Sequence, residues 1–357
     1  MNFRWTASVS MLALSASIAA PGTAAAAPPP VQKWSITSQT RIPVFDLMND
    51  VVATRAGSAW AVGGHSDHAT GAMPGLVYRW NGGTWQRLAV PGALDVTLEH
   101  VDASSDTDVW AFGRDWAGPS GKAFHWNGTS WRAFTVLDGD ELNAVDAVSP
   151  TDVWATGGDR LQHFDGTAWR AVDVPGMRRI GSLHVTSATS GWATGIDTEF
   201  RPRIWRWNGK VWNASPLPFS APGHFGGIVQ LGPGNVWAVG AEVYKDDPDG
   251  DDLYRSFALR WNGKAWSRVA MPAYGLWLDR PAPDGHGGVW MVAGEKLVNH
   301  RAGKWTAVVQ PSTPENRTTL ANIANVPGTG TMLGVGSIHD DGTSGDDPQD
   351  GLFITAR

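Results

Sequence analysis

The side chains best suited to chemistry lie in a few segments that interrupt an otherwise repetitive chain. One such segment is acidic and carries Asp247, Asp249 and Asp251 at alternate positions. Carboxylates at this spacing can supply oxygen ligands to Ca²⁺ from one flexible loop. The segment lacks the glycine and the distant glutamate of an EF-hand loop, and a solvated acidic loop is the alternative. The sequence therefore indicates no required cofactor. Ca²⁺ is the only ion that it suggests as a ligand.

A second candidate metal site combines histidine and aspartate from two distant segments. His65 and His68 lie near the start of the repetitive part of the chain, and His339 is followed by Asp340 and Asp341 near its end. Imidazole and carboxylate groups both bind divalent ions. The two segments would meet only if the first and last repeats are neighbours. Polar side chains at loop tips are the alternative.

Four acidic residues recur at the same place in four repeats, two positions after a glycine. A pair of carboxylates can act as acid and base on a glycosidic bond if the two groups lie about 5–10 Å apart. The sequence does not establish that distance, and stabilisation of a turn is the alternative role. The four residues are Asp115, Asp159, Asp197 and Glu242.

Five aromatic residues occur in one repeat only, in predicted loops or at predicted strand starts. An aromatic ring beside acids and amides can stack on the face of a sugar while the polar groups bind its hydroxyls. Packing in the centre of the fold is the alternative. The five residues are Trp116, Phe225, Tyr244, Tyr274 and Trp277. Together with the four acids they form the candidate ligand site.

No catalytic signature accompanies these residues. The chain contains no cysteine, which excludes disulfides, thiolate metal sites and a copper centre that needs a tyrosine crosslinked to cysteine. The Gly-x-Ser-x-Gly, His-Glu-x-x-His and phosphate-loop patterns do not occur either. The sequence therefore favours a non-catalytic protein. A hydrolase or lyase that acts on extracellular polysaccharide through the four acids is the alternative.

The candidates are positioned by a repeat whose most regular part is an apolar phrase, Val-Trp-Ala-x-Gly or a close variant. Successive copies are 38 (154 to 192) to 53 (237 to 290) residues apart, within the range for blades of a β-propeller. The apolar run is nearly continuous, which indicates a strand covered on both faces. The copies contain Trp60, Trp110, Trp154, Trp192, Trp237, Trp290 and, in a weaker seventh copy, Leu333.

A second phrase follows each of the first six copies and is built on a turn, Asn-Gly or Asp-Gly in five of them. These residues tolerate the positive φ of a tight hairpin. With one more strand before the first phrase, each repeat has four strands. The predicted fold is all-β, a single seven-bladed β-propeller of four-stranded antiparallel blades. The second phrases end at Trp85, Trp131, Trp169, Trp212, Trp266 and Trp305.

The seventh repeat lacks the second phrase, and its missing strand is found at the other end of the chain. The segment Gln32-Lys-Trp-Ser-Ile36 is similar to Lys264-Ala-Trp-Ser-Arg268, which ends a hairpin. An open ring would expose two strand edges, and pairing of the first strand with the last blade removes them. We therefore expect the strand around Trp34 to pair beside the strand that contains Phe353.

The two phrases together resemble kelch-type β-propeller repeats and the similar repeats of many secreted bacterial proteins. The resemblance rests on Gly63-Gly64 and Gly157-Gly158 after the first phrase, followed by the aromatic Asn-Gly or Asp-Gly turn, and it covers residues 32–357. It implies a propeller, and most propellers of this kind bind other molecules. Because the connections between second and third strands vary while the hairpins are uniform, we expect the former to bind the ligand.

The first 27 residues are typical of a secretory signal peptide, with Arg4, an apolar stretch and the pattern Ala25-x-Ala27. A short proline-rich linker, residues 28–31, then precedes the propeller of residues 32–357. No later stretch reaches the ~20 apolar residues of a membrane helix. The formal net charge of −6 argues against nucleic acid as a partner. We expect a secreted, extracellular monomer, not inserted in a membrane, that binds an extracellular glycan or protein.

Overall fold

The computed structural model describes residues 32–40, 45–66, 71–116, 118, 121–136, 142–245, 253–274, 277–313, 316–340 and 349–357. These residues belong to one compact unit, Gln32–Arg357. The described residues form an all-β fold, without a helix. The described part of the chain thus offers no helical segment of the length and apolarity needed to cross a membrane. The predicted signal peptide and linker, residues 1–31, lie outside the described residues.

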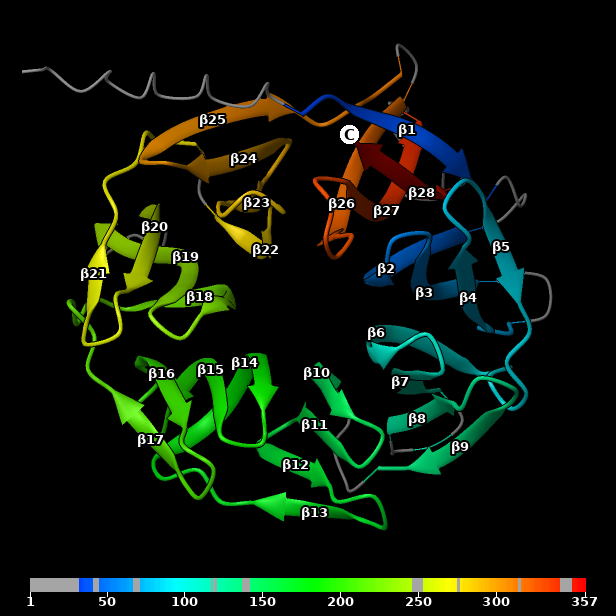
Figure 1. Ribbon diagram of the computed structural model, residues 1–357, viewed down its shortest axis with the longest axis horizontal. Helices are drawn as coiled ribbons and strands as arrows, with labels where there is room; N and C mark the ends of the chain where they lie inside the picture. The colour runs from blue at the N-terminus through cyan, green and yellow to red at the C-terminus, as the bar shows by residue number, and fades with distance from the viewer. Residues whose placement is uncertain are drawn as a thin grey trace, which may run out of the picture. The chain divides into compact units, whose positions relative to one another are not determined.

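Strands that follow one another in the chain pair into four-stranded antiparallel sheets, arranged in a ring within the unit (Figure 1). The first sheet contains β2 (Phe45–Arg55), β3 (Ser58–Ser66), β4 (Gly75–Trp80) and β5 (Trp85–Leu88). The next contains β6 (Val96–Ser105), β7 (Asp108–Asp115), β8 (Gly121–Trp126) and β9 (Trp131–Thr135). They are followed by β10 (Leu142–Ser149), β11 (Asp152–Gly157), β12 (Arg160–Phe164) and β13 (Trp169–Val172), and then by β14 (Met177–Ser187), β15 (Ser190–Asp197), β16 (Pro202–Trp207) and β17 (Trp212–Ser215).

The next eight strands are connected into one sheet that consists of two antiparallel halves. The first half contains β18 (Gly223–Gly232), β19 (Asn235–Lys245), β20 (Leu253–Trp261) and β21 (Trp266–Arg268). The second contains β22 (Asp279–Pro283), β23 (Val289–Ala293), β24 (Lys296–Arg301) and β25 (Lys304–Val309). A single parallel pair, Gly226 with Asp279, joins the halves. Each half therefore has the same internal order as the other four-stranded sheets.

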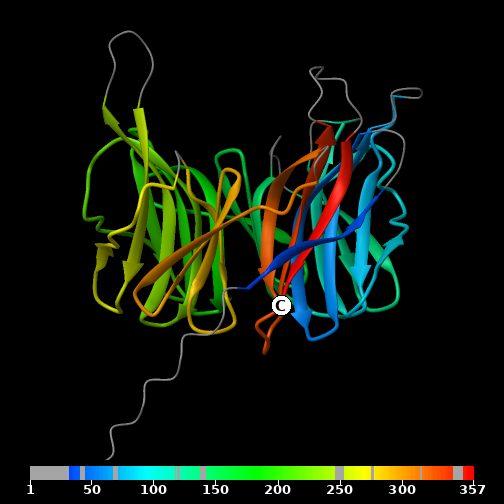
Figure 2. The same cartoon turned by 90° about the horizontal axis from the view of Figure 1, so that it is seen from above.

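The last sheet brings together the two ends of the described chain. Its strands are β26 (Asn316–Asn325), β27 (Met332–Asp340), β28 (Gln349–Ala356) and β1 (Trp34–Gln39). Strand β1 pairs antiparallel with β28, with Trp34 opposite Ala356 and Ser38 opposite Phe353. The predicted pairing of the segment around Trp34 with the strand that contains Phe353 is therefore present. Figure 2 shows β1, in dark blue, lying beside β28, in red.

The glycine that ends the apolar phrase permits a bulge in the first strand of the sheet. A Cβ atom at Gly63 would lie 1.9 Å from the carbonyl oxygen of Leu47, and one at Gly195 would lie 1.9 Å from that of Arg179. The register of the first strand shifts opposite each of these glycines. A bulge re-aims the side chains that follow it. In six sheets the first paired residues after the bulge are Asp50, His100, Ala144, Ser182, Gly227 and Asn322.

The second phrase forms a hairpin between the third and fourth strands, as the sequence predicts. In the first hairpin, Asn81 Oδ1 accepts hydrogen bonds from the backbone N–H groups of Gly83 at 3.1 Å and Thr84 at 2.9 Å. Gly82 has a φ of 94°, which explains the preference for glycine there. Asn127, Asp165, Asn208 and Asn262 make the corresponding contacts. The hairpin residues are therefore structural.

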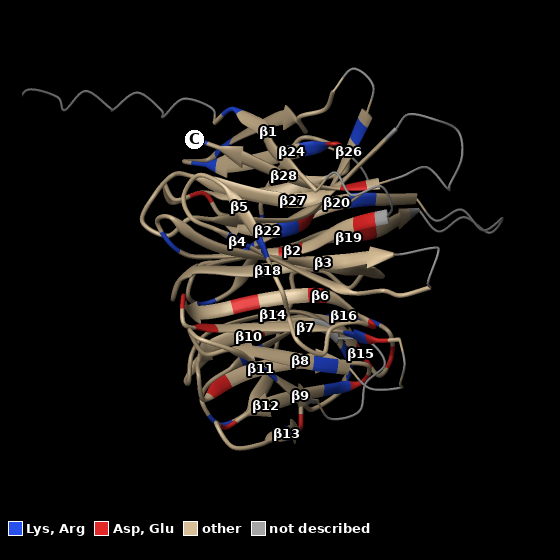
Figure 3. Cartoon of the chain, turned by 90° about the vertical axis from the view of Figure 1, so that its right-hand side faces the viewer, with Lys and Arg blue, Asp and Glu red and all other residues tan. Residues whose placement is uncertain are grey.

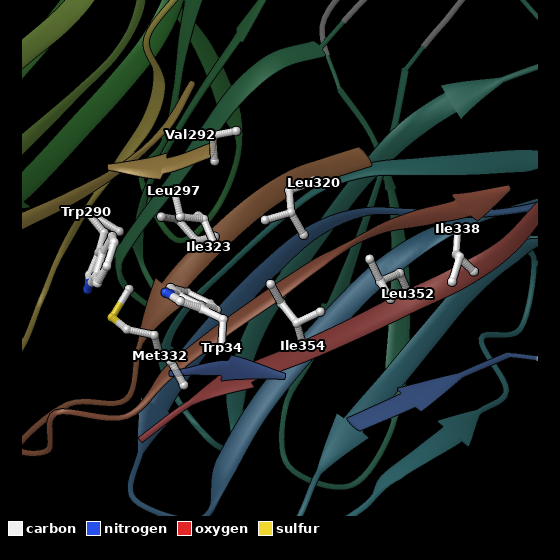
Figure 4. Packing of buried hydrophobic residues seen from close by; sticks show 12 residues of the cluster. Trp34, Trp290, Val292, Leu297, Leu320, Ile323, Met332, Ile338, Leu352 and Ile354 are labelled. Atoms are coloured by element: carbon white, nitrogen blue, oxygen red, sulfur yellow. The ribbon is translucent and has the colours of Figure 1, made fainter. Parts of the chain in front are cut away.

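The hydrophobic core consists of clusters between neighbouring sheets. Figure 4 shows one of them, in which Trp34 of β1 packs edge-on against Trp290 of β23 with ring centroids 5.6 Å apart. Trp290 Nε1 also donates a hydrogen bond to Gln32 Oε1 at 2.8 Å. The tryptophans of the apolar phrases are at most 3% exposed. The tryptophans of the apolar phrases therefore hold the sheets together and are not available to a ligand.

Candidate functional site

The first strand of each four-stranded group lines one central cavity of about 350 Å³. These innermost strands are β2, β6, β10, β14, β18, β22 and β26, and Figure 1 shows them around the centre of the ring. The cavity, called the channel below, is rich in polar groups placed there by the bulges and by the alternation of side chains. Its charged, titratable and amide side chains are Asp50, His100, Asp102, Asp146, His184, Arg280, Asn322 and Asn325.

Carboxylates of the channel connect one innermost strand to the next. Asp50 Oδ2 of β2 accepts a hydrogen bond from the backbone N–H of Val101 in β6 at 3.0 Å. The same contact runs from Asp102 to Ala147 at 2.6 Å and from Asp146 to Val185 at 2.8 Å. His184 continues the series through a hydrogen bond with the backbone of Gln230. These side chains thus connect each of four innermost strands to the backbone of the next one.

Burial changes the protonation of the channel acids. Loss of solvation, together with the nearby charge of Asp146, raises the pKa of Asp102 to about 8. Burial likewise raises the pKa of Asp146 to about 7, although a hydrogen bond with the Asp102 side chain works in the opposite direction. Burial also lowers the pKa of His184. At neutral pH the Asp102–Asp146 pair therefore retains a proton and His184 is neutral, so the channel carries less charge than its composition implies.

Arg280 gives the channel wall its positive charge. It is the only lysine or arginine among the described residues that line the channel. Its φ is 52°, in the left-handed region that non-glycine residues seldom adopt. Asp279, the preceding residue, is half-buried, and loss of solvation raises the pKa of its carboxyl group while the charge of Arg280 lowers it. Within the described residues, no cluster of three or more histidine or acidic side chains has the arrangement of a metal site.

The four predicted acids do not line the channel. They lie where the second strand of each sheet ends and the third begins. We call this side of the unit the loop face; in Figure 2 it is at the top. Glu242 in β19 is buried and bonded to Arg255 at 2.7 Å and to Arg268. Burial alone would raise the pKa of Glu242, but the hydrogen bonds from the two arginines lower it. Its carboxylate is therefore already neutralised by cations of its own sheet.

The carboxylate of Asp197 is likewise paired with two arginines. It contacts Arg201 at 3.1 Å and Arg203 at 2.8 Å, and it accepts hydrogen bonds from two backbone N–H groups of the connection from β15 to β16. Burial opposes ionisation, but these bonds lower the pKa of Asp197 to about 2. Figure 3 shows acidic and basic bands close together near the labels of β15 and β16. The recurring acid thus orders the loop, which was the alternative role.

The other two acids differ in exposure. Asp115 contacts Lys122 at 2.7 Å. The side chain of Asp159 is 86% exposed and lies 3.8 Å from Arg160. Each of the four predicted acids therefore has at least one cation of its own sheet within ion-pair distance.

Two of the five predicted aromatic residues are exposed on the loop face, and both lie against an arginine. Trp116 is 49% exposed, with the Arg114 guanidinium 4.4 Å from its ring centroid. Tyr244 is 53% exposed, with Arg255 at 5.9 Å. Phe200, which was not predicted from the sequence, is 63% exposed and has the Arg178 guanidinium 4.3 Å from its ring centroid. The sequence signal that could have identified Phe200 is that it is the single aromatic residue in a short polar connection between two strands.

The other three predicted aromatic residues pack against neighbouring rings. Phe225 lies against Phe257, with centroids 5.4 Å apart, and belongs to a core cluster. Tyr274 packs 6.0 Å from Trp305. Trp277 stacks on His224 at 3.8 Å and lies 5.0 Å from Tyr254. These three side chains therefore make packing contacts, which is the alternative role considered for the predicted aromatic residues.

The predicted metal ligands are only partly described. Asp247, Asp249, Asp251 and His68 lie outside the described residues, as does Asp341. His65 Nδ1 is 2.6 Å from Asp46 Oδ1, within its own sheet. His339 lies in β27, paired with Arg317 of β26 and Gln349 of β28, and its Nδ1 has no hydrogen-bond partner among the described residues. His65 and His339 are thus each placed, but the sites proposed for them are not tested.

Four-stranded antiparallel groups whose first strands surround a channel define a β-propeller, and comparison with solved structures agrees. The chain is similar to a structure of YCF48 bound to D1 peptide, with a TM-score of 0.59, 15% identity and coverage of 90% of this chain and 96% of that chain. It is also similar to YCF48 from Cyanidioschyzon merolae, with a TM-score of 0.57, 14% identity and coverage of 90% and 98%. At this identity the likeness shows the fold alone. No family model matches the sequence, and no curated protein matches it significantly.

Proposed function

We propose that this protein is a secreted, non-catalytic binding propeller that recognises a protein segment through its loop face. The observation that carries the proposal is a set of three exposed aromatic side chains, Trp116, Phe200 and Tyr244, each held against an arginine. Aromatic and arginine side chains are enriched where proteins bind one another. Support of a second kind comes from the similar propeller that is bound to a peptide.

A protein partner accounts for these contacts better than a neutral glycan. A sugar stacks on the open face of an aromatic ring, and each of the three rings already has an arginine near it. The hydrolase or lyase alternative needs an acid and a base that are free to exchange protons. The carboxylates of Asp197 and Glu242 are instead held by two arginines each. These points favour binding without catalysis.

The proposal includes the architecture of the whole repeat unit. We infer seven blades, with the eight-stranded sheet counted as two because one residue pair joins its halves. The ring is closed by β1 in the last blade, and the repeats are of the kelch-like type. Deletion of residues 32–40 should lower the melting temperature and cause self-association, because the edge of β28 would be unpaired. A shortened chain as stable and monomeric as the full one would contradict the closure.

Photocrosslinking tests the proposed binding face. A photoreactive amino acid is placed at position 116 or 244 of the full chain, and at position 210 on a hairpin turn as the control. Lys210 is exposed and its turn is made by backbone contacts to Asn208. Each variant is irradiated with the secreted proteins of the producing organism. We expect a discrete protein adduct from positions 116 and 244 and none from 210. Equal adducts at all positions, or binding on a glycan array without any protein adduct, would overturn the proposal.

A further inference from the structure

A groove on the loop face lies between β14 and the connection from β15 to β16. Its volume is about 580 Å³, and its lining includes Arg178 and Arg179 from β14 and Phe200 from the connection. Met177 and Ile196 add apolar surface to the same groove. Arg178 is the extra residue of a bulge, because Met177 pairs with Asp197 and Arg179 with Ile196. The bulge allows two consecutive arginines to line one groove.

The aromatic ring of the groove is held in place by a connection built around Asp197. Phe200 N donates to the Asp197 carbonyl at 2.9 Å, and Asp197 Oδ1 accepts from the N–H groups of Glu199 and Arg201 at 2.9 Å. Phe200 has a φ of 61°, which is unusual for a bulky residue. Such a conformation persists only where the surrounding contacts impose it. These contacts keep a large apolar side chain exposed instead of letting it fold onto the surface.

The cations of this region divide into two groups. Arg201 and Arg203 contact Asp197, and Arg201 also contacts Glu199 at 2.7 Å. Among the described residues, Arg178 and Arg179 contact no carboxylate. Asp159 also lines the groove but is exposed and lies beside Arg160. The groove therefore presents two guanidinium groups whose hydrogen-bond donors remain available for a ligand.

We propose that this groove binds an acidic segment of a partner polypeptide, an inference that rests on the proposed function and specifies its chemistry. Arg178 and Arg179 bind side-chain or terminal carboxylates, because guanidinium groups recognise carboxylates through paired hydrogen bonds. Phe200, Met177 and Ile196 accommodate apolar side chains between the acids. An acidic peptide provides both kinds of side chain in alternation, whereas an anionic polysaccharide is polar along its whole length.

Fluorescence anisotropy with the full protein tests this chemistry. The probe is a fluorescein-labelled twelve-residue peptide with the repeat Glu-Leu-Asp, and the competitors are poly-L-glutamate and polygalacturonate. The double variant Arg178→Gln/Arg179→Gln should bind the peptide about tenfold more weakly than wild type at low salt. The charge-matched control is Lys210→Gln/Lys264→Gln, which removes two exposed lysines from hairpin turns. The control should bind within about twofold of wild type.

Three outcomes would overturn the inference. The two double variants weaken binding equally, polygalacturonate competes as well as poly-L-glutamate, or wild type does not bind the peptide. Phe200→Ala serves as a second variant. It should weaken binding of the leucine-containing peptide more than binding of poly-L-glutamate. Unchanged melting temperatures show that the variants fold. A protein adduct at positions 116 or 244 without binding of the acidic peptide would leave the proposed function standing and remove only this inference.

Discussion

The channel and the loop face use the same types of side chain in opposite ways. In the channel, Asp50, Asp102 and Asp146 accept hydrogen bonds from the backbone of the neighbouring innermost strand. On the loop face, the side chain of Asp159 is 86% exposed, and the Arg114 and Arg178 guanidinium groups lie over exposed rings. The difference teaches that the surroundings, and not the residue type, decide whether a charged group joins blades or remains available to a partner. Each prediction below tests one side of this comparison.

Among substitutions in the channel and on the loop face, the largest effect is expected for Asp50→Ala in the channel. Asp50 is buried and accepts hydrogen bonds from the N–H groups of Val51 at 2.8 Å and Val101 at 3.0 Å and from the Asn322 side chain. The variant leaves these donors without a partner, so the free energy of unfolding should fall by about 3 kcal/mol. Urea denaturation followed by tryptophan fluorescence measures the change.

The matched control for Asp50→Ala is Asp159→Ala on the loop face. Its side chain is 86% exposed, and removing it should change the free energy of unfolding by less than about 0.5 kcal/mol. Equal losses in the two variants would show that the channel carboxylates do not join the strands, and the contrast between the two regions would disappear.

The second prediction concerns the pH dependence of stability. The folded-state pKa of Asp102 is raised to about 8, so the folded protein holds a proton that the unfolded chain releases near pH 4. Stability from this group is therefore present at low pH and is lost as pH rises through about 8. Between pH 7 and 9 this loss should lower the free energy of unfolding by about 1.4 kcal/mol. His184 does not contribute to this change. Burial lowers its pKa, so its imidazole is neutral in both the folded and the unfolded state between pH 7 and 9.

The isosteric variant Asp102→Asn isolates this contribution. An asparagine can still accept from the Ala147 N–H and donate to Asp146, but it does not titrate. Between pH 7 and 9 its free energy of unfolding should fall by only about 0.4 kcal/mol, the part that comes from Asp146 with its pKa raised to about 7, whereas Asp159→Asn should retain the slope of the wild type. Denaturation series at three pH values distinguish them. A wild-type slope in Asp102→Asn would assign the proton to another group.

The strand pattern could be predicted from the sequence because the same short phrases recur from repeat to repeat. Apolar phrases, hairpin turns and the strand around Trp34 each rely on local chemistry: burial on two faces, positive φ and an unpaired edge. The bulges were missed, although their signal was visible. Gly63 and its equivalents end the apolar phrase because a Cβ atom would meet the carbonyl oxygen of the first strand.

The candidate site was harder to predict because it depends on distances across sheets. The four acids were identified by position, but their partners, such as Arg268 for Glu242, come from strands whose packing one sequence does not reveal. The channel acids Asp102 and Asp146 were seen only as part of a strand pattern. Phe200 was overlooked because its exposure results from a backbone conformation and not from its residue type.

The third prediction tests whether the conformation of Phe200 is imposed on it. Its φ of 61° costs a non-glycine residue free energy that glycine does not pay. Phe200→Gly should therefore be about 1 kcal/mol more stable to unfolding than Phe200→Ala, although both remove the ring. Thermal and urea unfolding of the pair measure the difference. Two equally stable variants would mean that the loop relaxes when the ring is removed, and that Asp197 does not fix the conformation.

The smallest effect on stability is expected for Trp116→Ala on the loop face. Trp116 is 49% exposed and its indole N–H donates to Thr97 at 2.9 Å, so its loss should cost no more than about 0.5 kcal/mol. Trp110 lies in β7, the strand that precedes Trp116, and is fully buried, so Trp110→Ala should cost about 3–5 kcal/mol. Photocrosslinking from position 244 adds the functional readout. Trp116→Ala should reduce the yield of the protein adduct while leaving stability intact, because an exposed ring contributes to binding and not to the core. A large loss of stability with an unchanged adduct would reverse these roles and place Trp116 with the structural tryptophans.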